Sequence, residues 1–185
     1  WSSAWADFDN DGDMDVFVGA SSTFDFGTHK YMENMGDGTF EDMSATTGLA
    51  GVIDDELRIE GVASDFDNDG FVDVMGAGNI LKNNGDGTFS ANNMDFFSGP
   101  VGDLNNDGFL DVISSSGTIQ FNDGNENNYF VVHLEGVESN INGIGARVTL
   151  VTASMTQIRD IKSGNGFRYM SSLNAYFGLG QDDAI

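Results

Sequence analysis

Short runs of mostly apolar residues recur along the first two thirds of the chain, and each is bounded by Gly, Asp and Asn. The clearest runs span residues 16–18, 72–75 and 110–113. Runs of this length between turn residues favour buried strands over helices. Near the C-terminal end, apolar and polar residues alternate over 147–151 and 157–161, which is typical of a small antiparallel sheet. The pattern predicts an all-β protein.

Turns rich in glycine and aspartate separate these strands at regular places. Residues 34–40 and 83–89 both read Asn-x-Gly-Asp-Gly-Thr-Phe, which is typical of a tight hairpin. Residues 122–125 occupy the same place in a third copy. The repeating unit is an acidic loop, a strand, a Gly-Asp turn and a strand, with an insertion at 21–29 and a longer spacer at 44–60. Such internal repeats predict a partial β-propeller or a solenoid.

The acidic loop is the most informative motif, because its nine-residue pattern occurs three times, beginning at Asp7, Asp65 and Asp103. Acidic or amide side chains stand at its first, third, fifth and ninth positions, and a glycine at the sixth permits a sharp turn. Carboxylates at this spacing repel one another unless a cation lies among them. A single copy could be a solvated turn, but three copies with the same glycine and final aspartate favour a metal site.

Calcium fits this spacing, because it binds six to eight oxygen ligands and one such loop can wrap one ion. The sequence therefore predicts about three Ca²⁺ ions. The ligands expected in the first two loops are the side chains of Asp7, Asp9, Asp11, Asp15, Asp65, Asp67, Asp69 and Asp73. Those expected in the third loop are Asp103, Asn105, Asp107 and Asp111, and the backbone carbonyls of Asp13, Phe71 and Phe109 supply the seventh positions. Because Asn105 is neutral, the third site should bind calcium more weakly.

The residues around the loops argue against an EF-hand. An EF-hand needs flanking helices and a bidentate Glu at the twelfth position, whereas the twelfth positions here are Val18, Gly76 and Ser114. The flanks instead predict strands. The calcium loops are therefore expected to connect strands.

These loops and turns resemble the FG-GAP or VCBS repeats of integrin-type and bacterial surface β-propellers. Residues 40–49 also resemble the segment that follows the Gly-Asp turn in those repeats. The resemblance covers residues 1–128, and it implies a calcium ion in a hairpin loop of each blade.

The chain changes character after residue 128. Residues 1–128 carry 25 acidic and 3 basic side chains, whereas residues 129–185 carry 5 and 4. The second part resembles the ASPIC/UnbV domain over residues 129–136, 139–150, 164–167 and 176–180. We therefore expect two domains, at 1–128 and 129–185, the second being a small antiparallel β-domain.

Both ends of the chain suggest an unfinished structure. A closed propeller has about four or more blades, but only three repeat units are present, and the C-terminal domain is expected to be truncated. Unfinished sheets expose backbone groups that can pair with another chain. The sequence therefore leaves two alternatives open, a fragment of a longer protein or a subunit that self-assembles into a polymer or filament by sheet completion.

Net charge and composition argue against several classes of function. A formal charge of −23 argues against binding to nucleic acid or to an anionic membrane surface. There is no cysteine and no apolar run of about 20 residues, so neither disulfides nor a membrane span is expected. Calcium loops of this kind fill best where calcium is millimolar, and the chain begins at Trp1, from which we expect that a leader or a larger N-terminal region has been removed. An extracellular location, secreted or at the cell surface, is predicted.

We expect no enzymatic activity. The chain holds only two histidines, His29 and His133, and no cysteine. Its carboxylates cluster in the metal loops, and no Gly-rich phosphate loop or Gly-x-Ser-x-Gly motif is present.

The sequence therefore predicts an extracellular calcium-binding structural or adhesion module, with self-association or other surface proteins as partners. The alternative is a calcium-dependent carbohydrate-binding module. In that alternative, glycans would contact exposed aromatic residues and the side chains of Asn92, Asn93, Asn127 and Asn128. Five aromatic residues near the first loop are nevertheless expected to belong mainly to the core: Trp1, Trp5, Phe8, Phe17 and Phe40.

Overall fold

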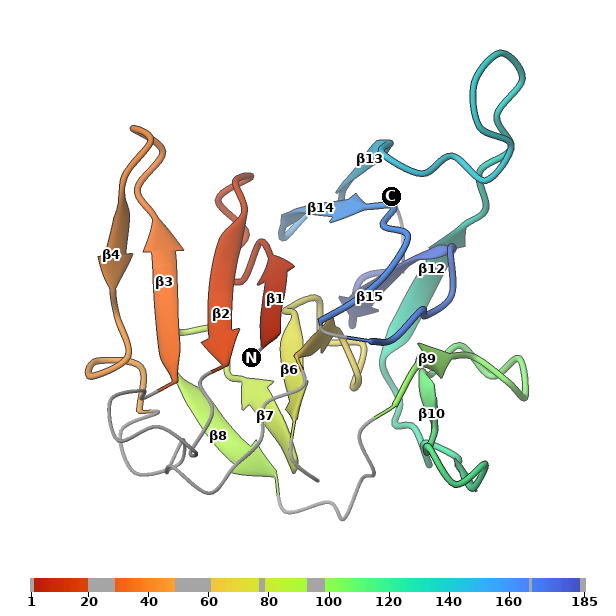
Figure 1. Cartoon of the computed structure of the whole chain (residues 1–185), viewed down its shortest axis with the longest axis horizontal. Coiled ribbons are helices and arrows are strands. Elements are labelled where there is room, and N and C mark those ends of the chain that lie inside the picture. Colours follow the sequence, from red (N-terminus) through yellow and green to blue (C-terminus); the bar gives the residue numbers. More distant parts are fainter. Residues whose placement is uncertain are drawn as a thin grey trace.

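The computed structural model describes residues 2–19, 29–48, 61–76, 79–92, 99–166 and 168–183. These residues form antiparallel β-sheets and no helix (Figure 1). The prediction of an all-β fold is confirmed. Trp1, Asn93, and most of the predicted insertion and spacer lie outside the described residues. The described part contains no helix that is long and apolar enough to cross a membrane.

Two four-stranded sheets follow the predicted repeats. Blade 1 contains β1 (Ser2–Ala6), β2 (Asp15–Gly19), β3 (Lys30–Asn34) and β4 (Phe40–Asp42), hydrogen-bonded in that order. Blade 2 contains β5 (Val62–Ser64), β6 (Asp73–Gly76), β7 (Asn79–Asn83) and β8 (Phe89–Asn92), again in that order. In each blade the acidic loop joins the first strand to the second, and the Gly-Asp turn joins the third strand to the fourth. This arrangement is that of a β-propeller blade.

The third repeat forms a smaller sheet. Blade 3 contains β9 (Val101–Gly102), β10 (Asp111–Ile113) and β11 (Ile119–Gln120), in the order β11-β10-β9. After the turn at 122–125 the chain continues into β12, which pairs in another sheet. Within the described residues, blade 3 therefore has three strands where blades 1 and 2 have four.

The C-terminal region is also made of antiparallel strands. β12 (Asn128–Val132) pairs with β15 (Ala175–Gly180), and β13 (Arg147–Val151) pairs with β14 (Thr156–Asp160). The last two strands agree with the alternation predicted at 147–151 and 157–161. A cluster of buried apolar side chains holds this region together: Leu150, Ile161, Ala175, Phe177 and Leu179.

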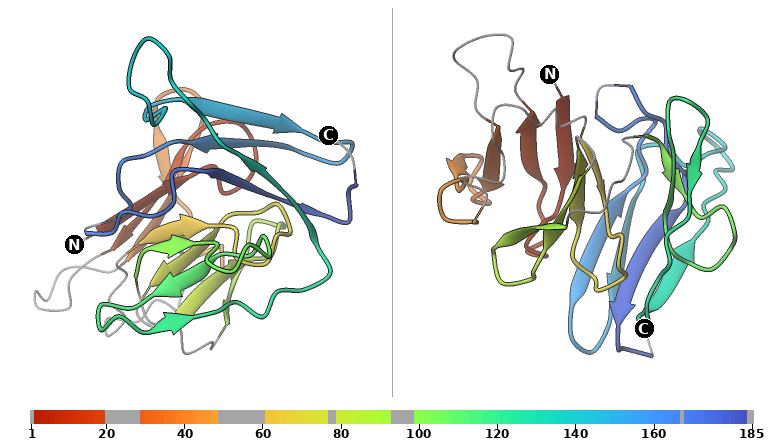
Figure 2. Two further views of the ribbon diagram at one scale, coloured as in Figure 1. Left: turned by 90° about the vertical axis from the view of Figure 1, so that its right-hand side faces the viewer. Right: turned by 90° about the horizontal axis from the view of Figure 1, so that it is seen from below.

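The blades pack face to face, with an apolar core at each joint (Figure 2). Between blades 1 and 2, the rings of Phe8, Phe17, Tyr31 and Phe89 lie within 5.6–6.4 Å of one another, centroid to centroid. Five of these six pairs are edge to face, and such pairs stabilise a core by about 0.5–1.5 kcal/mol each beyond area burial. Blade 2 contacts blade 3 through a second cluster.

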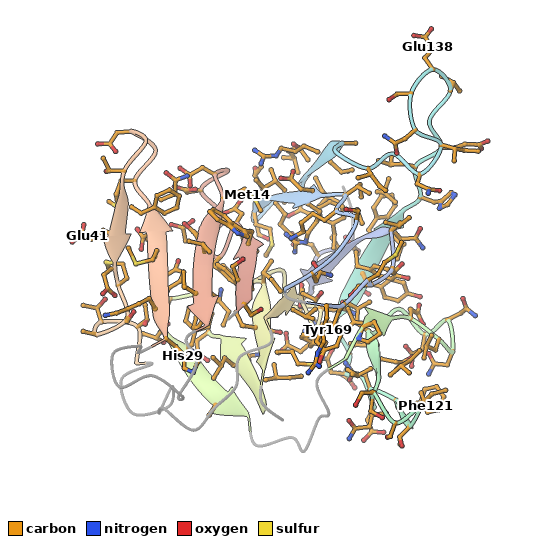
Figure 3. All side chains as sticks on the ribbon, in the orientation of Figure 1. Met14, His29, Glu41, Phe121, Glu138 and Tyr169 are labelled. Carbon is orange, nitrogen blue, oxygen red and sulfur yellow. The ribbon has the colours of Figure 1, made fainter. Side chains whose placement is uncertain are left out.

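The C-terminal region shares the second of these cores. Tyr169 is buried in it, and Tyr176 packs against it, so that Tyr169 lies between blades and C-terminal strands (Figure 3). The Ser172 backbone N–H donates to the Val101 carbonyl at 2.9 Å, and Lys162 Nζ donates to the Trp5 carbonyl at 2.7 Å. The predicted domain boundary after residue 128 falls one residue into β12.

Candidate metal centres

The three acidic loops have the same backbone conformation. At the fourth position, Asn10, Asn68 and Asn106 have φ of 61°, 57° and 60°, in the left-handed region. At the sixth position, the glycines have φ of 98°, 96° and 88°. Asparagine and glycine tolerate this region better than other residues. Each loop therefore folds back on itself with little strain, as the sequence pattern predicts.

The first aspartate of each loop organises the turn. Asp7 accepts the N–H groups of Asp11 and Gly12, both at 3.1 Å. Asp65 accepts those of residues 69 and 70 at 3.2 and 2.9 Å, and Asp103 accepts those of residues 107 and 108 at 3.1 and 2.9 Å. Hydrogen bonds from the backbone thus fix the orientation of this carboxylate in all three copies.

The last aspartate of each loop joins the loop to the rest of its blade. One oxygen of Asp15 accepts the Phe8 N–H at 2.9 Å, and the other accepts the Asn34 N–H at 2.9 Å. The same two bonds are made by Asp73, with Phe66 and Asn83, and by Asp111, with Leu104 and Asn122, at 2.8–2.9 Å. These three aspartates are almost fully buried. The sequence pattern alone indicates no role for Asn34, Asn83 or Asn122, although each begins a Gly-Asp turn.

The carboxylates converge in the first two loops. Ligand oxygens of Asp7, Asp9 and Asp15 lie within 4.8 Å of one another, as do those of Asp65, Asp67 and Asp73. The structure therefore brings together six of the predicted ligands as two clusters that could hold a metal ion. For Asp11, Asp69, Asp107 and the carbonyls of residues 13, 71 and 109, ligation stays a prediction.

The third loop has the same hydrogen-bonded shape but a different donor set. Asn105 Oδ1 accepts the Asp107 N–H at 3.2 Å, and its Nδ2 donates to Asp107 Oδ2 at 2.7 Å. The side chain at the third position is thus a neutral amide that is bonded to a neighbouring carboxylate. Its calcium site, like the others, stays a prediction.

Burial and mutual repulsion make ionisation of these carboxyl groups unfavourable. The pKa of Asp7 is raised to about 6, mainly by burial; the hydrogen bond from the Gly12 N–H lowers it, and the nearby Asp9 and Asp11 raise it. Burial likewise raises the pKa of Asp15 to about 7, and that of Asp65 to about 7. A divalent cation among these oxygens would oppose both effects.

The donor set fits calcium. All side-chain donors in the two clusters are carboxylate oxygens, the ligand type that hard cations such as Ca²⁺ prefer. Three side-chain oxygens in the described residues of these loops are buried and accept no hydrogen bond from the protein: Asn10 Oδ1, Asp13 Oδ1 and Asp67 Oδ1. Because buried polar atoms are nearly always paired, these oxygens are suited to a ligand.

The strand facing each loop gives the three sites different surroundings. The residue directly before the first asparagine of the Gly-Asp turn differs among the three repeats: it is Glu33 in β3, Lys82 in β7 and Phe121 after β11. Lys82 Nζ forms an ion pair with Asp67 and a second one with Asp69 Oδ2 at 3.2 Å. Burial, Asp9 and Asp11 raise the pKa of Glu33. The first loop therefore has an additional carboxylate nearby, and the second has an ammonium group.

The C-terminal region contacts the second loop directly. The Gly180 N–H donates to the Asn68 carbonyl at 2.9 Å. A Cβ at Gly178 would lie 2.2 Å from Asp65 Oδ2 and 2.3 Å from the Asn68 backbone. The guanidinium of Arg159 lies over the Phe177 ring, 5.2 Å from its centroid, and attracts Asp65 electrostatically.

Comparison with known families agrees with this geometry. Residues 7–76 match the family model of the FG-GAP-like repeat, a range that covers the first two loops, β2 to β4 of blade 1, and β5 and β6 of blade 2. Residues 136–185 match the ASPIC and UnbV model. The two matches confirm the resemblance to FG-GAP repeats and to the ASPIC/UnbV domain that the sequence indicates. FG-GAP-like repeats form β-propeller modules and often bind calcium. The third loop lies outside the matched FG-GAP range but has the same hydrogen bonds. No curated protein matches the chain significantly.

Other residues singled out in the sequence have different surroundings. Phe8 and Phe17 are core residues, as predicted, but Trp5 and Phe40 are exposed and meet edge to face at 6.2 Å. The amide of Asn127 donates to the Asp67 carbonyl at 2.9 Å, and that of Asn128 to the Asp182 carbonyl at 3.0 Å. His133 bonds to Asn174 at 2.9 Å.

Proposed function

We propose that this chain is an extracellular calcium-binding structural or adhesion module, in which about three Ca²⁺ ions hold the acidic loops of successive blades. The observation that carries the proposal is the repetition of one hydrogen-bonded frame, with converging carboxylates in two loops and the same frame in the third.

Calcium would stabilise the blades by neutralising carboxylates that otherwise repel one another. The same aspartates that would bind the ion also anchor the Gly-Asp turns, through Asp15 to Asn34 and through Asp73 to Asn83. An ion in the loop would therefore reinforce the contact between a blade's inner strands and its outer hairpin. The proposed role of the metal is structural and not catalytic.

An extracellular location suits this role. FG-GAP-like repeats are typical of extracellular or surface proteins. Calcium is millimolar outside cells, a concentration at which sites of even modest affinity fill. Partners in that setting would be other surface proteins or further copies of this chain. β11 lies at the edge of its three-stranded sheet, where an incoming strand could complete the sheet.

The carbohydrate-binding alternative rests on the exposed pair of Trp5 and Phe40. Against it, Asn127 and Asn128, two of the residues expected to contact sugars, have their amides bonded to backbone carbonyls. A glycan array with and without calcium separates the two functions, since calcium-dependent binding to a defined sugar would favour the alternative.

Isothermal titration calorimetry of the chelator-treated chain with Ca²⁺ tests the proposal. We expect about three bound ions and a higher melting temperature in calcium than in chelator. Asp9→Asn should remove or weaken one of these binding events, whereas Asp123→Asn, an exposed aspartate outside the loops, should change none. Absence of binding heat together with an unchanged melting temperature would refute the proposed function.

A further inference from the structure

Loop 2 (residues 65–73) is bonded to a cation that belongs to the protein itself. Lys82 Nζ pairs with Asp67 and, at 3.2 Å, with Asp69 Oδ2. These two aspartates stand at the third and fifth positions of the loop, where calcium ligands are expected. The Lys82 side chain is 34% exposed and both aspartates are less exposed, so solvent ions screen the pairs only in part. One ammonium group therefore bridges two carboxylates that otherwise repel each other.

Blade 1 has the opposite charge at the equivalent place. Glu33 directly precedes the first asparagine of its Gly-Asp turn, as Lys82 does in blade 2. Burial raises the pKa of Glu33, and so do the charges of Asp9 and Asp11, the third and fifth residues of loop 1 (7–15). Glu33 thus adds a negative charge to the same part of the loop that Lys82 neutralises in blade 2.

Other side chains do not make up this difference. Arg147 attracts Asp13 of loop 1, but its guanidinium is already bonded to the Asp160 carboxylate at 2.7 and 3.0 Å. In blade 3 the position of Lys82 is taken by Phe121, which brings no charge to loop 3 (103–111). Loops 1 and 3 therefore have the stronger need of a cation from solution.

The C-terminal half of the chain also holds loop 2 in place. The Asp67 backbone carbonyl accepts the side-chain amides of Asn125 at 2.7 Å and Asn127 at 2.9 Å. The Gly180 N–H donates to the Asn68 carbonyl at 2.9 Å. These bonds fix the backbone of loop 2 from outside, while Lys82 neutralises its side chains.

We propose that Lys82 is a built-in counter-ion of loop 2, so that loop 2 and the C-terminal strands packed on it keep their stability without calcium, whereas loops 1 and 3 gain theirs from the ion. Calcium enters loop 2 by displacing the ammonium group. At low calcium the protein would then retain a stable unit of blade 2 and the C-terminal region, while loops 1 and 3 open more often. The part that concerns loops 1 and 3 rests on the proposed function.

The three loops carry matched probes of this difference. In each, two backbone N–H groups donate to the first aspartate of the loop, and hydrogen exchange at these amides reports how often the loop opens. The amides belong to residues 11 and 12, 69 and 70, and 107 and 108. In chelator, we expect those of loop 2 to exchange at least about tenfold more slowly than those of loops 1 and 3. Saturating calcium should slow exchange in loops 1 and 3 more than in loop 2.

Substitution of Lys82 is the direct test. Lys82→Met removes the charge and keeps a long side chain, so exchange at residues 69 and 70 should accelerate about tenfold in chelator and stay unchanged in saturating calcium. Lys82→Arg keeps the charge and should retain the protection. Lys30→Gln is the control and should alter none of the loops, because Lys30 pairs with Asp42 away from them. Unchanged exchange of loop 2 in Lys82→Met in chelator would overturn the proposal.

The counter-ion should also be transferable to blade 1. Glu33→Lys places an ammonium group beside Asp9 and Asp11, and it should slow exchange at residues 11 and 12 in chelator by about tenfold. Glu33→Gln removes the extra repulsion without supplying a cation, so it should slow exchange less. Equal exchange in the two variants would show that an ammonium group at this position does not stabilise the loop, and would overturn the proposal.

Calorimetry on the same samples separates this inference from the proposed function. Absence of calcium binding would refute the calcium module, but slower exchange of loop 2 in chelator and its loss in Lys82→Met would still support the counter-ion. Calcium binding by a chain whose loop 2 ignores Lys82→Met would overturn the counter-ion and leave the calcium module standing.

Discussion

At the residue scale, the three loops differ most at the position facing them from the neighbouring strand. Lys82 pairs with Asp67 and Asp69 in the second loop, where the first loop has Glu33 and the third has Phe121. An ammonium group competes with a metal ion for the same oxygens, whereas a further carboxylate adds attraction. The sites should therefore differ in affinity even though their backbone frames agree.

Lys82→Gln should tighten calcium binding at the second loop by about tenfold, or ~1.4 kcal/mol, because the competing charge is removed. Calorimetry that resolves the individual sites measures this change. Lys30→Gln is a matched control, since Lys30 pairs with Asp42 at 2.6 Å, away from the loops. Equal affinities in the unmodified chain and in Lys82→Gln would contradict competition by Lys82.

The buried carboxyl groups also make the metal-free protein sensitive to pH. Asp7, Asp15 and Asp65 have pKa values raised to about 6 to 7 from the ordinary 3.8. Between pH of about 4 and about 7, the folded state therefore binds more protons than the unfolded state. The stability that protonation contributes is lost as pH rises through about 7.

In chelator, the free energy of unfolding should fall as pH rises from 4 toward about 7, and urea titrations at several pH values measure it. In saturating calcium, the stabilisation by the metal should increase over the same range, because protons compete with the ion. A metal-free protein whose stability rises steadily with pH over this range would show that these pKa values are not raised.

At the scale of elements, the Gly-Asp turns do more than connect strands. The backbone N–H of the turn asparagine donates to the last aspartate of its own loop. In blades 2 and 3 the side-chain amide of the same asparagine also donates to a backbone carbonyl in the loop of the preceding blade. A single asparagine thus links a turn, its loop and the neighbouring blade through its backbone N–H and its side-chain amide. The repeats are therefore stabilised as a group.

Asn83→Ala should lower the free energy of unfolding by about 1–3 kcal/mol, because the buried Phe8 carbonyl loses its donor. Asn34→Ala should cost less, since the Asn34 amide donates only within blade 1. Urea denaturation in calcium, at concentrations too low for association between copies, compares the two. Equal losses would indicate that the bond between blades contributes little.

Much of this organisation could be predicted from the sequence. The spacing within 7–15, 65–73 and 103–111 defined the loops, because the turn requires Gly and Asn at fixed places and these are local constraints. The strand flanks and the hairpins at 34–40 and 83–89 followed from equally local patterns. The role of Asn83 could not be predicted, because it depends on a partner 75 residues away.

Exposure was harder to predict than the strands themselves. Phe8 and Phe40 both stand near loops and turns, yet Phe8 is in the core and Phe40 is on the surface. The difference depends on which face of blade 1 meets blade 2, and alternation within a single strand does not specify the neighbour.

At the scale of the whole molecule, the C-terminal region packs against the blades. Gly178 in β15 lies so close to Asp65 and Asn68 that no side chain fits between them. The packing of the C-terminal region against the blades therefore depends on the shape of the second loop. We expect loop 2 and the C-terminal strands to lose structure together.

Gly178→Ala should destabilise the protein by about 1–3 kcal/mol, the usual cost of overpacking, and should weaken calcium binding at the second loop. Gly102→Ala is the matched control, because Gly102 is also a strand glycine and the nearest atom, Ser172 Cβ, would lie 3.8 Å from the new Cβ. Thermal melts and calorimetry measure both effects. Unchanged calcium binding in Gly178→Ala would indicate that the two regions are energetically independent.

The backbone bonds to Asp7, Asp65 and Asp103 have a consequence for the timing of metal entry. Since these bonds hold each loop in its final shape, an arriving ion has little chain entropy to remove and no segment to rearrange. Uptake should therefore approach the speed of diffusion, and circular dichroism should change little as the sites fill. Calcium would then be a permanent structural component of the protein and would not act as a regulatory signal.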